Sequence, residues 1–285
     1  IKIRNFLYNY RLLSITKISQ PVISIGNITS GGTGKTPLTI FIANEAQKRS
    51  FNPGIVSRGY GRKSVGLQIV HDGLTERLDV KDAGDEPYFI AKCLNNIPVI
   101  VSNNRLEGAQ RLIDDYNVDL VILDDAFQHR RIHRDTDIVL INGSEQNNAY
   151  RMIPLGHLRE MPSELKRADH VIITKGDIYD VPNNIQKYLS NVTSSKEQYQ
   201  IQYYNNYTDN KEKLNDKPLE PMFAFCGIAH PELFYDSLRG LGIQLEGQSS
   251  FIDHVDYSPK IISDLINKIE ATNSKNIITT DKDLV

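Results

Sequence analysis

The sequence predicts an α/β fold: a mainly parallel sheet flanked by helices, like that of phosphate-loop NTPases, and a second, smaller α/β domain joined to it by a polar hairpin or linker. Two observations lead to this prediction. Short, almost continuously apolar runs such as residues 21–28 and 118–123 alternate with helical patterns, as expected for a sheet covered on both faces. A Gly-rich turn at residues 31–36, GGTGKT, follows the first run and opens a helix.

The predicted elements follow one another at short spacing. The larger domain is expected to contain a strand at 21–28, a helix at 35–49, a strand at 67–70, a helix at 86–94, a strand at 98–102, a helix at 105–116, and strands at 118–125, 136–142 and 170–175. The smaller domain is expected to contain a strand at 222–228, helices at 231–241 and 259–271, and a strand at 276–280.

Changes of composition suggest where the parts of the chain meet. Residues 192–220 are polar and rich in Asn and Tyr, which indicates an exposed hairpin or linker. We therefore expect an N-terminal segment at 1–20, a core at 21–191, the linker at 192–220 and a smaller domain at 221–285. The chain begins with Ile and stops just after a predicted strand, so we expect residues to be missing at either end.

Residues 1–20 place apolar side chains three and four positions apart among basic ones, a spacing that predicts an amphipathic helix. A basic, aromatic helix of this kind can lie in a membrane interface. It can equally pack on its own domain, and the segment alone leaves both interpretations open.

Composition excludes several classes of function. The formal net charge is −2, so no overall basic field points to nucleic acid. The two cysteines, Cys93 and Cys226, have neither the number nor the spacing of a disulfide framework or a zinc site. No apolar run approaches the length of about 18 residues that a transmembrane helix needs.

The turn at 31–36 has the residues that bind a nucleoside triphosphate. Gly31, Gly32 and Gly34 allow backbone N–H groups to curl around phosphate oxygens, and the following helix directs its N-terminal dipole at the anion. Lys35 can reach the outer phosphates and the Thr36 hydroxyl can ligate Mg²⁺. The usual pattern, however, has Gly where this chain has Thr29, which leaves a Gly-rich turn without a ligand as the alternative.

Two acids follow the apolar run at 118–123. Asp124 and Asp125 stand where a phosphate-loop enzyme needs a carboxylate to hold Mg²⁺. Adjacent carboxylates would repel each other without a cation. The alternative is a pair of solvated acids in a turn.

Other polar loops supply candidate acceptor residues, each with a plain structural alternative. Arg58 lies in a Gly-rich loop, and Asp85 and Glu86 open a helix, where carboxylates also serve as caps. Arg159 and Glu160 could be a surface ion pair of little consequence. Two histidines complete the set: His129, which could be structural, and His254, which follows an acid and could take a proton from a hydroxyl or simply be exposed.

Seven motifs occur in a fixed order: IGNITSGGTGKTP, SRGYGR, GDEP, DDAFQH, LRE, RAD and FIDH. Each is weak alone, but together they resemble the tetraacyldisaccharide 4′-kinase family over about residues 21–280. In this branch of the phosphate-loop superfamily the loop reads G-G-x-G-K-T, so Thr29 is normal. Two departures concern the acceptor side. Ala126 replaces the Gly of DDGFQH, and Leu155 and His157 replace residues of P-A-G-P-L-R-E.

The resemblance implies transfer of the ATP γ-phosphate to the 4′-hydroxyl of a membrane-embedded tetraacyl disaccharide 1-phosphate. It implies that residues 31–36, including Thr33, bind ATP, and that Thr36, Asp124 and Asp125 hold Mg²⁺. Asp85 and His254 would activate the hydroxyl. The residues expected near the acceptor or the phosphates are Arg58, Glu86, His129, Arg159 and Glu160.

The resemblance also favours the interface interpretation of residues 1–20. It places a protein of this kind, as a peripheral and monomeric enzyme without a nucleic-acid partner, on the cytoplasmic face of the inner membrane of a Gram-negative bacterium. A rival is an ATPase switch of the partitioning or maturation type. Such proteins often carry Lys at the position of Ser30. A membrane-peripheral binding module with a relic nucleotide site is a further alternative, against which Lys35 and Thr36 count.

Overall fold

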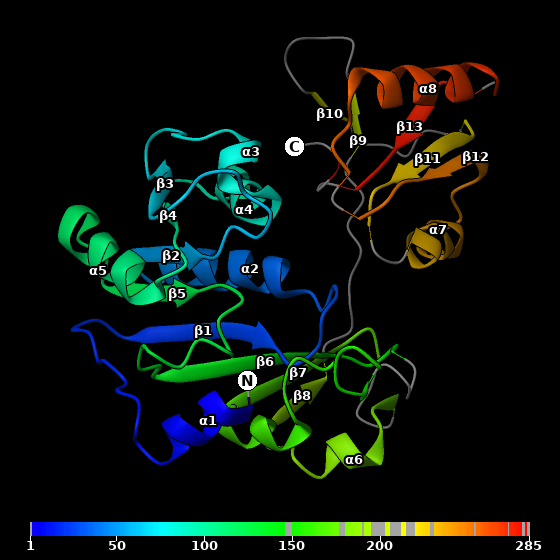
Figure 1. Cartoon of the computed structure of the whole chain (residues 1–285). Coiled ribbons are helices and arrows are strands. Elements are labelled where there is room, and N and C mark those ends of the chain that lie inside the picture. The colour runs from blue at the N-terminus through cyan, green and yellow to red at the C-terminus, as the bar shows by residue number, and fades with distance from the viewer. Residues whose placement is uncertain are drawn as a thin grey trace. The chain divides into compact units, whose positions relative to one another are not determined.

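The computed structural model describes residues 2–145, 150–176, 180–189, 191–194, 203–205, 212–214, 220–228, 231–253, 255–272, 274–280 and 283. The chain divides into two compact units, Ile1–Glu197 and Gln198–Val285. Figure 1 shows their elements, and each unit is described by itself below.

The first unit is built on an eight-stranded sheet with the strand order β3-β4-β2-β5-β1-β6-β7-β8. All neighbouring strands run parallel except β3 and β4, which are antiparallel. This confirms the predicted mainly parallel sheet. The strands are β1 (Val22–Asn27), β2 (Pro53–Ser57), β3 (Gln68–Asp72), β4 (Pro98–Val101), β5 (Leu120–Leu123), β6 (Thr136–Asn142), β7 (His170–Thr174) and β8 (Val192–Ser194).

Successive side chains of the central strands pack alternately into two separate hydrophobic cores, one on each face of the sheet. In β2, Ile55 packs with α2 and α4 on one face, while the next residue, Val56, packs with α5 on the other. Both side chains are fully buried, which explains why these strands read as continuous apolar runs. The helices of this unit are α1 (Lys2–Asn9), α2 (Lys35–Lys48), α3 (Val80–Ala83), α4 (Asp85–Cys93), α5 (Arg105–Tyr116), the 3₁₀ helix η2 (Pro162–Arg167) and α6 (Asn183–Gln186).

The structure corrects two expectations about the ends of this unit. The helix expected within 1–20 is confined to α1, because a turn with Arg11 in the left-handed region (φ 57°) ends it. The segment then runs along the domain, where Thr16 forms a bridge with Ile132. Residues 192–194, expected in the linker, instead form β8, the last strand of the sheet.

The second unit contains a three-stranded parallel sheet with β11 (Met222–Cys226) between β12 (Leu245–Ser250) and β13 (Asn276–Ile278). The sequence did not predict β12, whose alternating polar residues include a Gly and two Ser. Helices α7 (Pro231–Gly240) and α8 (Pro259–Glu270) belong to this unit, as does an antiparallel pair, β9 (Tyr203–Asn205) with β10 (Glu212–Leu214).

Among the residues described, no helix is both long and apolar enough to cross a membrane.

Candidate functional site

The loop between β1 and α2 has the backbone of a phosphate-binding turn. Gly31 and Gly34 have φ values of 122° and 85°, which only glycine adopts without strain. Gly34 is the residue before α2, and it has no side chain with which to cap the first N–H groups of the helix. Those N–H groups and the helix dipole are therefore available to an anion.

Three hydrogen bonds hold this loop from outside. Asn27, at the end of β1, donates from Nδ2 to Thr33 Oγ1 over 3.0 Å. The Thr174 hydroxyl donates to the Thr33 carbonyl over 3.1 Å, and the Ser30 N–H donates to the His157 carbonyl over 2.7 Å. The Thr33 side chain is therefore buried and supports the loop, and only the backbone of this residue is left to contact a ligand. His157, one of the departures from the family motif, contacts the loop through its carbonyl, which any residue supplies.

Lys35 forms an ion pair at the base of the loop. Its Nζ lies 3.6 Å from Asp125 Oδ1, and its side chain is largely buried. Asp125 also accepts two hydrogen bonds, of 3.1 and 3.0 Å, from Arg159 Nη1. Burial alone would raise the pKa of Asp125, but the charges of Lys35 and Arg159 outweigh it and hold that pKa below its ordinary value. Asp125 itself has φ 46°, so the left-handed residue of this turn is not Ala126, the position where Ala replaces Gly.

Asp124 has a different environment from its neighbour. Its carboxylate is buried and accepts hydrogen bonds from Thr39 Oγ1 at 3.2 Å and Ser57 Oγ at 2.8 Å. Burial, followed by the negative charges of Glu86 and Asp125, raises the pKa of Asp124 to about 6. A cation arriving here would reverse this effect by stabilising the charged form.

The residues present suit Mg²⁺ bound together with phosphate. Thr36 carries a hydroxyl, and Asp124 and Asp125 carry carboxylates, which are oxygen ligands of the kind that Mg²⁺ prefers. The buried Asp124 gains most from a cation, because its surroundings disfavour its charge. The part of the chain that the structure describes contains no group of three or more His, Cys, Asp or Glu side chains able to hold a metal alone. Mg²⁺ characteristically needs only one or two carboxylates, with phosphate and water completing its shell.

The loop at 58–62 packs against the start of α4. A Cβ on Gly59 would lie 2.7 Å from the Ala83 carbonyl oxygen, and one on Gly84 would lie 3.0 Å from the Tyr60 carbonyl oxygen. Only glycine permits this approach, and it brings the loop that carries Arg58 to the first turn of α4. Arg58 is exposed there, while Asp85 and Glu86, in that turn, are half-buried.

Glu160 does not form the surface ion pair with its neighbour Arg159 that was the structural alternative to an acceptor role. Its carboxylate is fully buried and accepts hydrogen bonds from Arg167 Nη2 at 2.8 Å and Asn5 Nδ2 at 2.8 Å. Gln128 Nε2 contacts the same carboxylate at 3.3 Å. Both oxygens are therefore engaged within the protein, which places Glu160 in a structural network.

His129 is half-buried among cations. Burial, and then the charges of Arg105 and Arg134, lower the pKa of His129 to about 4, so the imidazole is neutral near pH 7. Its Nε2 atom is buried without a hydrogen-bond partner. His254 lies outside the described residues.

The sequence offered no signal for several residues that shape this site. Arg105, at the start of α5, is buried and donates from Nη2 to the Asp125 carbonyl at 3.5 Å. Burial lowers the pKa of Arg105 to about 10. Asn27, Thr39 and Ser57 were likewise overlooked, since a polar residue within a strand or helix looks ordinary until its partner is known.

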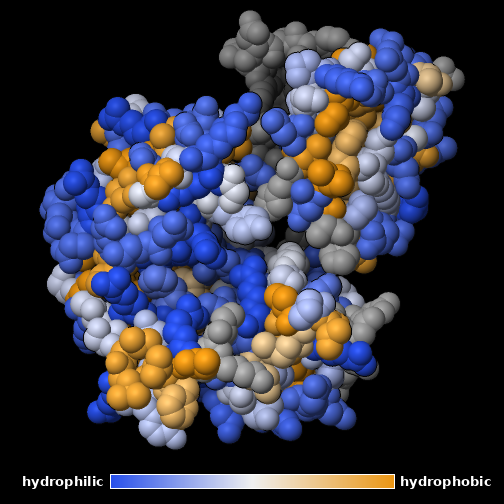
Figure 2. Space-filling model, in the orientation of Figure 1, coloured by the Kyte–Doolittle hydropathy of each residue, from blue (hydrophilic) through white to orange (hydrophobic). Residues whose placement is uncertain are grey.

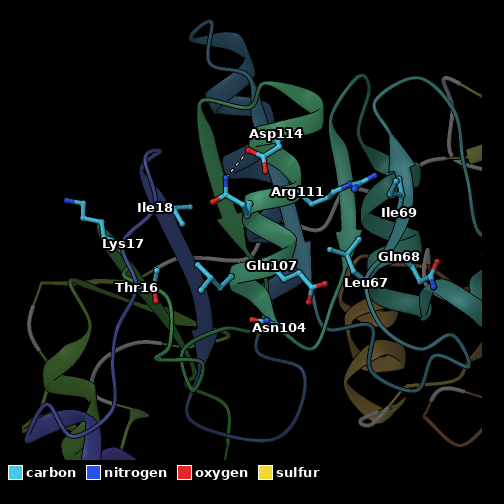
Figure 3. A pocket seen from close by; sticks show the side chains of 12 residues that line it. Thr16, Lys17, Ile18, Leu67, Gln68, Ile69, Asn104, Glu107, Arg111 and Asp114 are labelled. Atoms are coloured by element: carbon cyan, nitrogen blue, oxygen red, sulfur yellow. Dashed lines mark hydrogen bonds between the residues drawn. The ribbon is translucent and has the colours of Figure 1, made fainter.

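A separate groove of about 790 Å³ lies beside α5 (Figure 3). Its walls come from the segment Thr16, Lys17 and Ile18, from the exposed side of α5, and from the edge strand β3. None of its lining residues belongs to the phosphate loop or to the acids beside it, so this groove is not part of the site.

The fold and the loop define a phosphate-loop nucleotide-binding protein. A family model described as "Tetraacyldisaccharide-1-P 4'-kinase" matches residues 1–285. The chain therefore belongs to the tetraacyldisaccharide 4′-kinase family, which makes it an enzyme of the kinase class and supports the kinase prediction over the rival ATPase switch.

Individual relatives agree with the family. The tetraacyldisaccharide 4′-kinase of Desulfotalea psychrophila is 36% identical over 292 residues, covering 100% of this chain and 83% of that protein. That of Chlorobium limicola is 36% identical over 293 residues, covering 99% and 82%. Among solved structures, the "apo" form of LpxK from Aquifex aeolicus in complex with ATP has 32% identity and a TM-score of 0.76, covering 100% of this chain and 84% of that one.

Proposed function

We propose that this protein transfers the γ-phosphate of ATP to the 4′-hydroxyl of a tetraacyl disaccharide 1-phosphate at a membrane surface. The observation that carries the proposal is the buried Lys35–Asp125 pair at the base of a Gly-rich loop, in a chain of this family. A lysine close to the helix N-terminus is what an incoming triphosphate requires.

The residues around the loop take distinct roles in this proposal. The backbone of residues 31–36 and Lys35 would bind the phosphates. Thr36, Asp124 and Asp125 would hold Mg²⁺, which when bound neutralises phosphate charge. Arg159 and the exposed Arg58 would orient phosphates or acceptor, and their positive charge suits either.

Asp85 would take the proton of the attacking hydroxyl, since it stands in the first turn of α4, next to Glu86, whose charge is felt at Asp124. His254 would assist in activating the hydroxyl. The division of the chain into segment 1–20, core 21–191, linker 192–220 and domain 221–285 remains part of the proposal, with β8 as its correction. The protein would act as a monomer without nucleic acid.

Contact with the membrane would come from α1 and the turn after it. Ile3, Phe6 and Tyr10 are exposed apolar side chains on this segment, and Leu12 and Ile15 continue the surface. Basic residues are interspersed, which suits an anionic leaflet. The corresponding location is the cytoplasmic face of the inner membrane of a Gram-negative bacterium.

The test is phosphate transfer from labelled ATP with Mg²⁺ to the disaccharide acceptor in detergent micelles. Wild type should label the acceptor, and Lys35→Ala should abolish labelling because the phosphates lose their buried cation. Lys48→Ala, on the exposed side of the same helix, is the matched control and should label normally. Acceptor-independent ATP hydrolysis without labelling would replace the kinase proposal with the ATPase-switch alternative.

A further inference from the structure

Helix α1 reaches the core through a buried carboxylate. Asn5 is buried on the inner side of α1, and its Nδ2 donates to Glu160 Oε1 over 2.8 Å. The other oxygen, Oε2, is taken by Arg167 at 2.8 Å and Gln128 at 3.3 Å. Glu160 therefore joins the N-terminal helix, a side chain from the turn after β5, and the end of η2 in one network.

One arm of this network ends at the phosphate loop. Gln128 Nε2 also donates to the Asn27 carbonyl over 2.8 Å. Asn27 is the residue whose side chain holds Thr33 at 3.0 Å and contacts the Gly31 carbonyl at 3.5 Å. Gln128 thus links Glu160 directly to Asn27, the residue whose side chain supports the phosphate loop.

A second arm ends at Lys35. Arg159 precedes Glu160, and its backbone N–H donates to the Ile28 carbonyl, just before the loop, over 2.7 Å. Its guanidinium binds Asp125, which pairs with Lys35. Arg159 and Glu160 are consecutive residues, so a backbone shift at Glu160 also displaces Arg159.

The other contacts of α1 reach the same stretch of chain. Arg4 Nη2 donates to the Gln128 carbonyl over 2.7 Å, and Arg130 Nη1 donates to the Asn5 carbonyl over 3.2 Å. The Arg130 guanidinium lies 5.2 Å from the centre of the Tyr8 ring. Phe6 of α1 is exposed, and Figure 2 shows an apolar patch where this helix lies.

We propose that Glu160 is a positioning residue that couples the seating of α1 to the phosphate loop. Withdrawal of Asn5 leaves a buried carboxylate short of one donor, which is costly, so Glu160 and its partner Gln128 rearrange. The loop held by Asn27 and the Arg159–Asp125 pair then lose their set positions, and nucleotide binds more weakly.

The coupling is reciprocal, as linkage requires: nucleotide binding must strengthen the seating of α1 to the same extent. Since the outer side of α1 carries the proposed membrane contact, ATP-loaded protein should hold its membrane helix more firmly than free protein. This inference rests on the proposed function, because it presumes that the loop binds ATP.

The experiment measures the dissociation constant of a non-hydrolysable ATP analogue with Mg²⁺, without acceptor or membrane. Asn5→Ala should raise it about fivefold to tenfold, towards the low end of usual coupling between two sites. Asn9→Ala removes the same side chain from an exposed position of the same helix and is the matched control, expected to bind as wild type does.

A double-mutant cycle separates coupling from general loosening. Gln128→Met keeps the volume of the side chain but removes both of its hydrogen bonds. Asn5→Ala combined with Gln128→Met should bind the analogue no more weakly than the worse single variant, because both act through Glu160. In wild type the analogue should also increase binding to vesicles of anionic phospholipid, and this increase should vanish in Asn5→Ala.

The proposal is overturned if Asn5→Ala binds the analogue as wild type does, or if Asn9→Ala weakens binding equally. Full additivity of the two variants would also overturn it. Failure of wild type to bind the analogue at all is a separate outcome, because it removes the proposed nucleotide function and the coupling with it.

Discussion

The neutral state of His129 makes the stability of the protein depend on pH in a calculable way. Its pKa is lowered from 6.5 to about 4, first by burial and then by the charges of Arg105, Arg134, Arg4 and Arg131. Above pH 6.5 neither the folded nor the unfolded chain protonates this imidazole, so it adds no pH dependence. Between pH 6.5 and 4 the unfolded chain takes up a proton that the folded chain refuses, so stability falls as the pH falls.

The size of this effect follows from the shift. The pKa of His129 differs by about 2.5 between the unfolded and the folded chain, which lowers the free energy of unfolding by roughly 3 kcal/mol at pH values below 4, where both states are protonated. At pH 5, allowing for solvent at this half-buried site, the loss is about 1–2 kcal/mol. His129→Gln removes the titrating group at similar size, so it isolates this contribution from that of Asp124, whose raised pKa acts in the opposite direction.

The measurement is urea unfolding of wild type and His129→Gln at pH 7, 6 and 5. We expect the variant to gain about 1–2 kcal/mol on wild type between pH 7 and pH 5, whatever its stability at pH 7. Added salt should reduce only the part that comes from the arginines, because burial is not screened. A stability difference that stays constant over these pH values would refute the assignment of a buried, neutral imidazole.

Three further outcomes are expected. Gly34→Ala should lower the free energy of unfolding by about 1–2 kcal/mol in a urea titration, because φ at this position is 85°. The strain comes from the backbone, since the added Cβ would meet only ordinary contacts at 3.7 Å. Gly32→Ala is the control: its Cβ would have open space around it, and the variant should unfold as wild type does. Phe6→Ala should weaken binding to anionic vesicles about fivefold, whereas Phe51→Ala should not; equal binding of all three proteins in a sedimentation assay would count against the membrane role. Asp85→Ala should lower kcat strongly while the affinity for ATP stays near normal, and steady-state kinetics with an unchanged kcat would remove Asp85 from its proposed role.

The sheet and the phosphate loop could be predicted because their signals are local. Both faces of the central strands are buried, so residues such as Ile122 and Leu123 must both be apolar, and this leaves a continuous run in the sequence. The loop needs glycine at positions 31 and 34, because the backbone there has φ values of 122° and 85°, which no other residue adopts as easily. Requirements of this kind can be read from a few adjacent letters.

The point at which the N-terminal helix ends and the surroundings of Glu160 could not be predicted, because their causes lie far away in sequence. Apolar spacing continues beyond Asn9, but the segment after it is held by the bridge between Thr16 and Ile132. Glu160 stands next to an arginine, which suggests an ion pair. Its actual partner on α1, Asn5, is 155 residues away, and no spacing rule connects the two.

The adjacent acids Asp124 and Asp125 have different surroundings, which the motif did not predict. The sequence suggested that Asp124 and Asp125 would share one cation to avoid repulsion. In the structure they avoid it by taking separate surroundings: hydroxyls hold Asp124, whose pKa is raised, while Lys35 and Arg159 hold Asp125, whose pKa is lowered. Because Asp125 has a left-handed backbone conformation, its side chain points in a different direction from that of Asp124.

This division has a consequence for how the site accepts its ligand. In the proposed binding mode, a triphosphate would compete with Asp125 for the ammonium group of Lys35, because these two side chains are paired. Arg159 would ease the competition by remaining paired with Asp125. Asp124, by contrast, gains only from a cation, since its burial and its acidic neighbours disfavour its charge. In the proposed site, Lys35 and Arg159 would therefore favour the phosphates, and Asp124 would favour the Mg²⁺ that accompanies them.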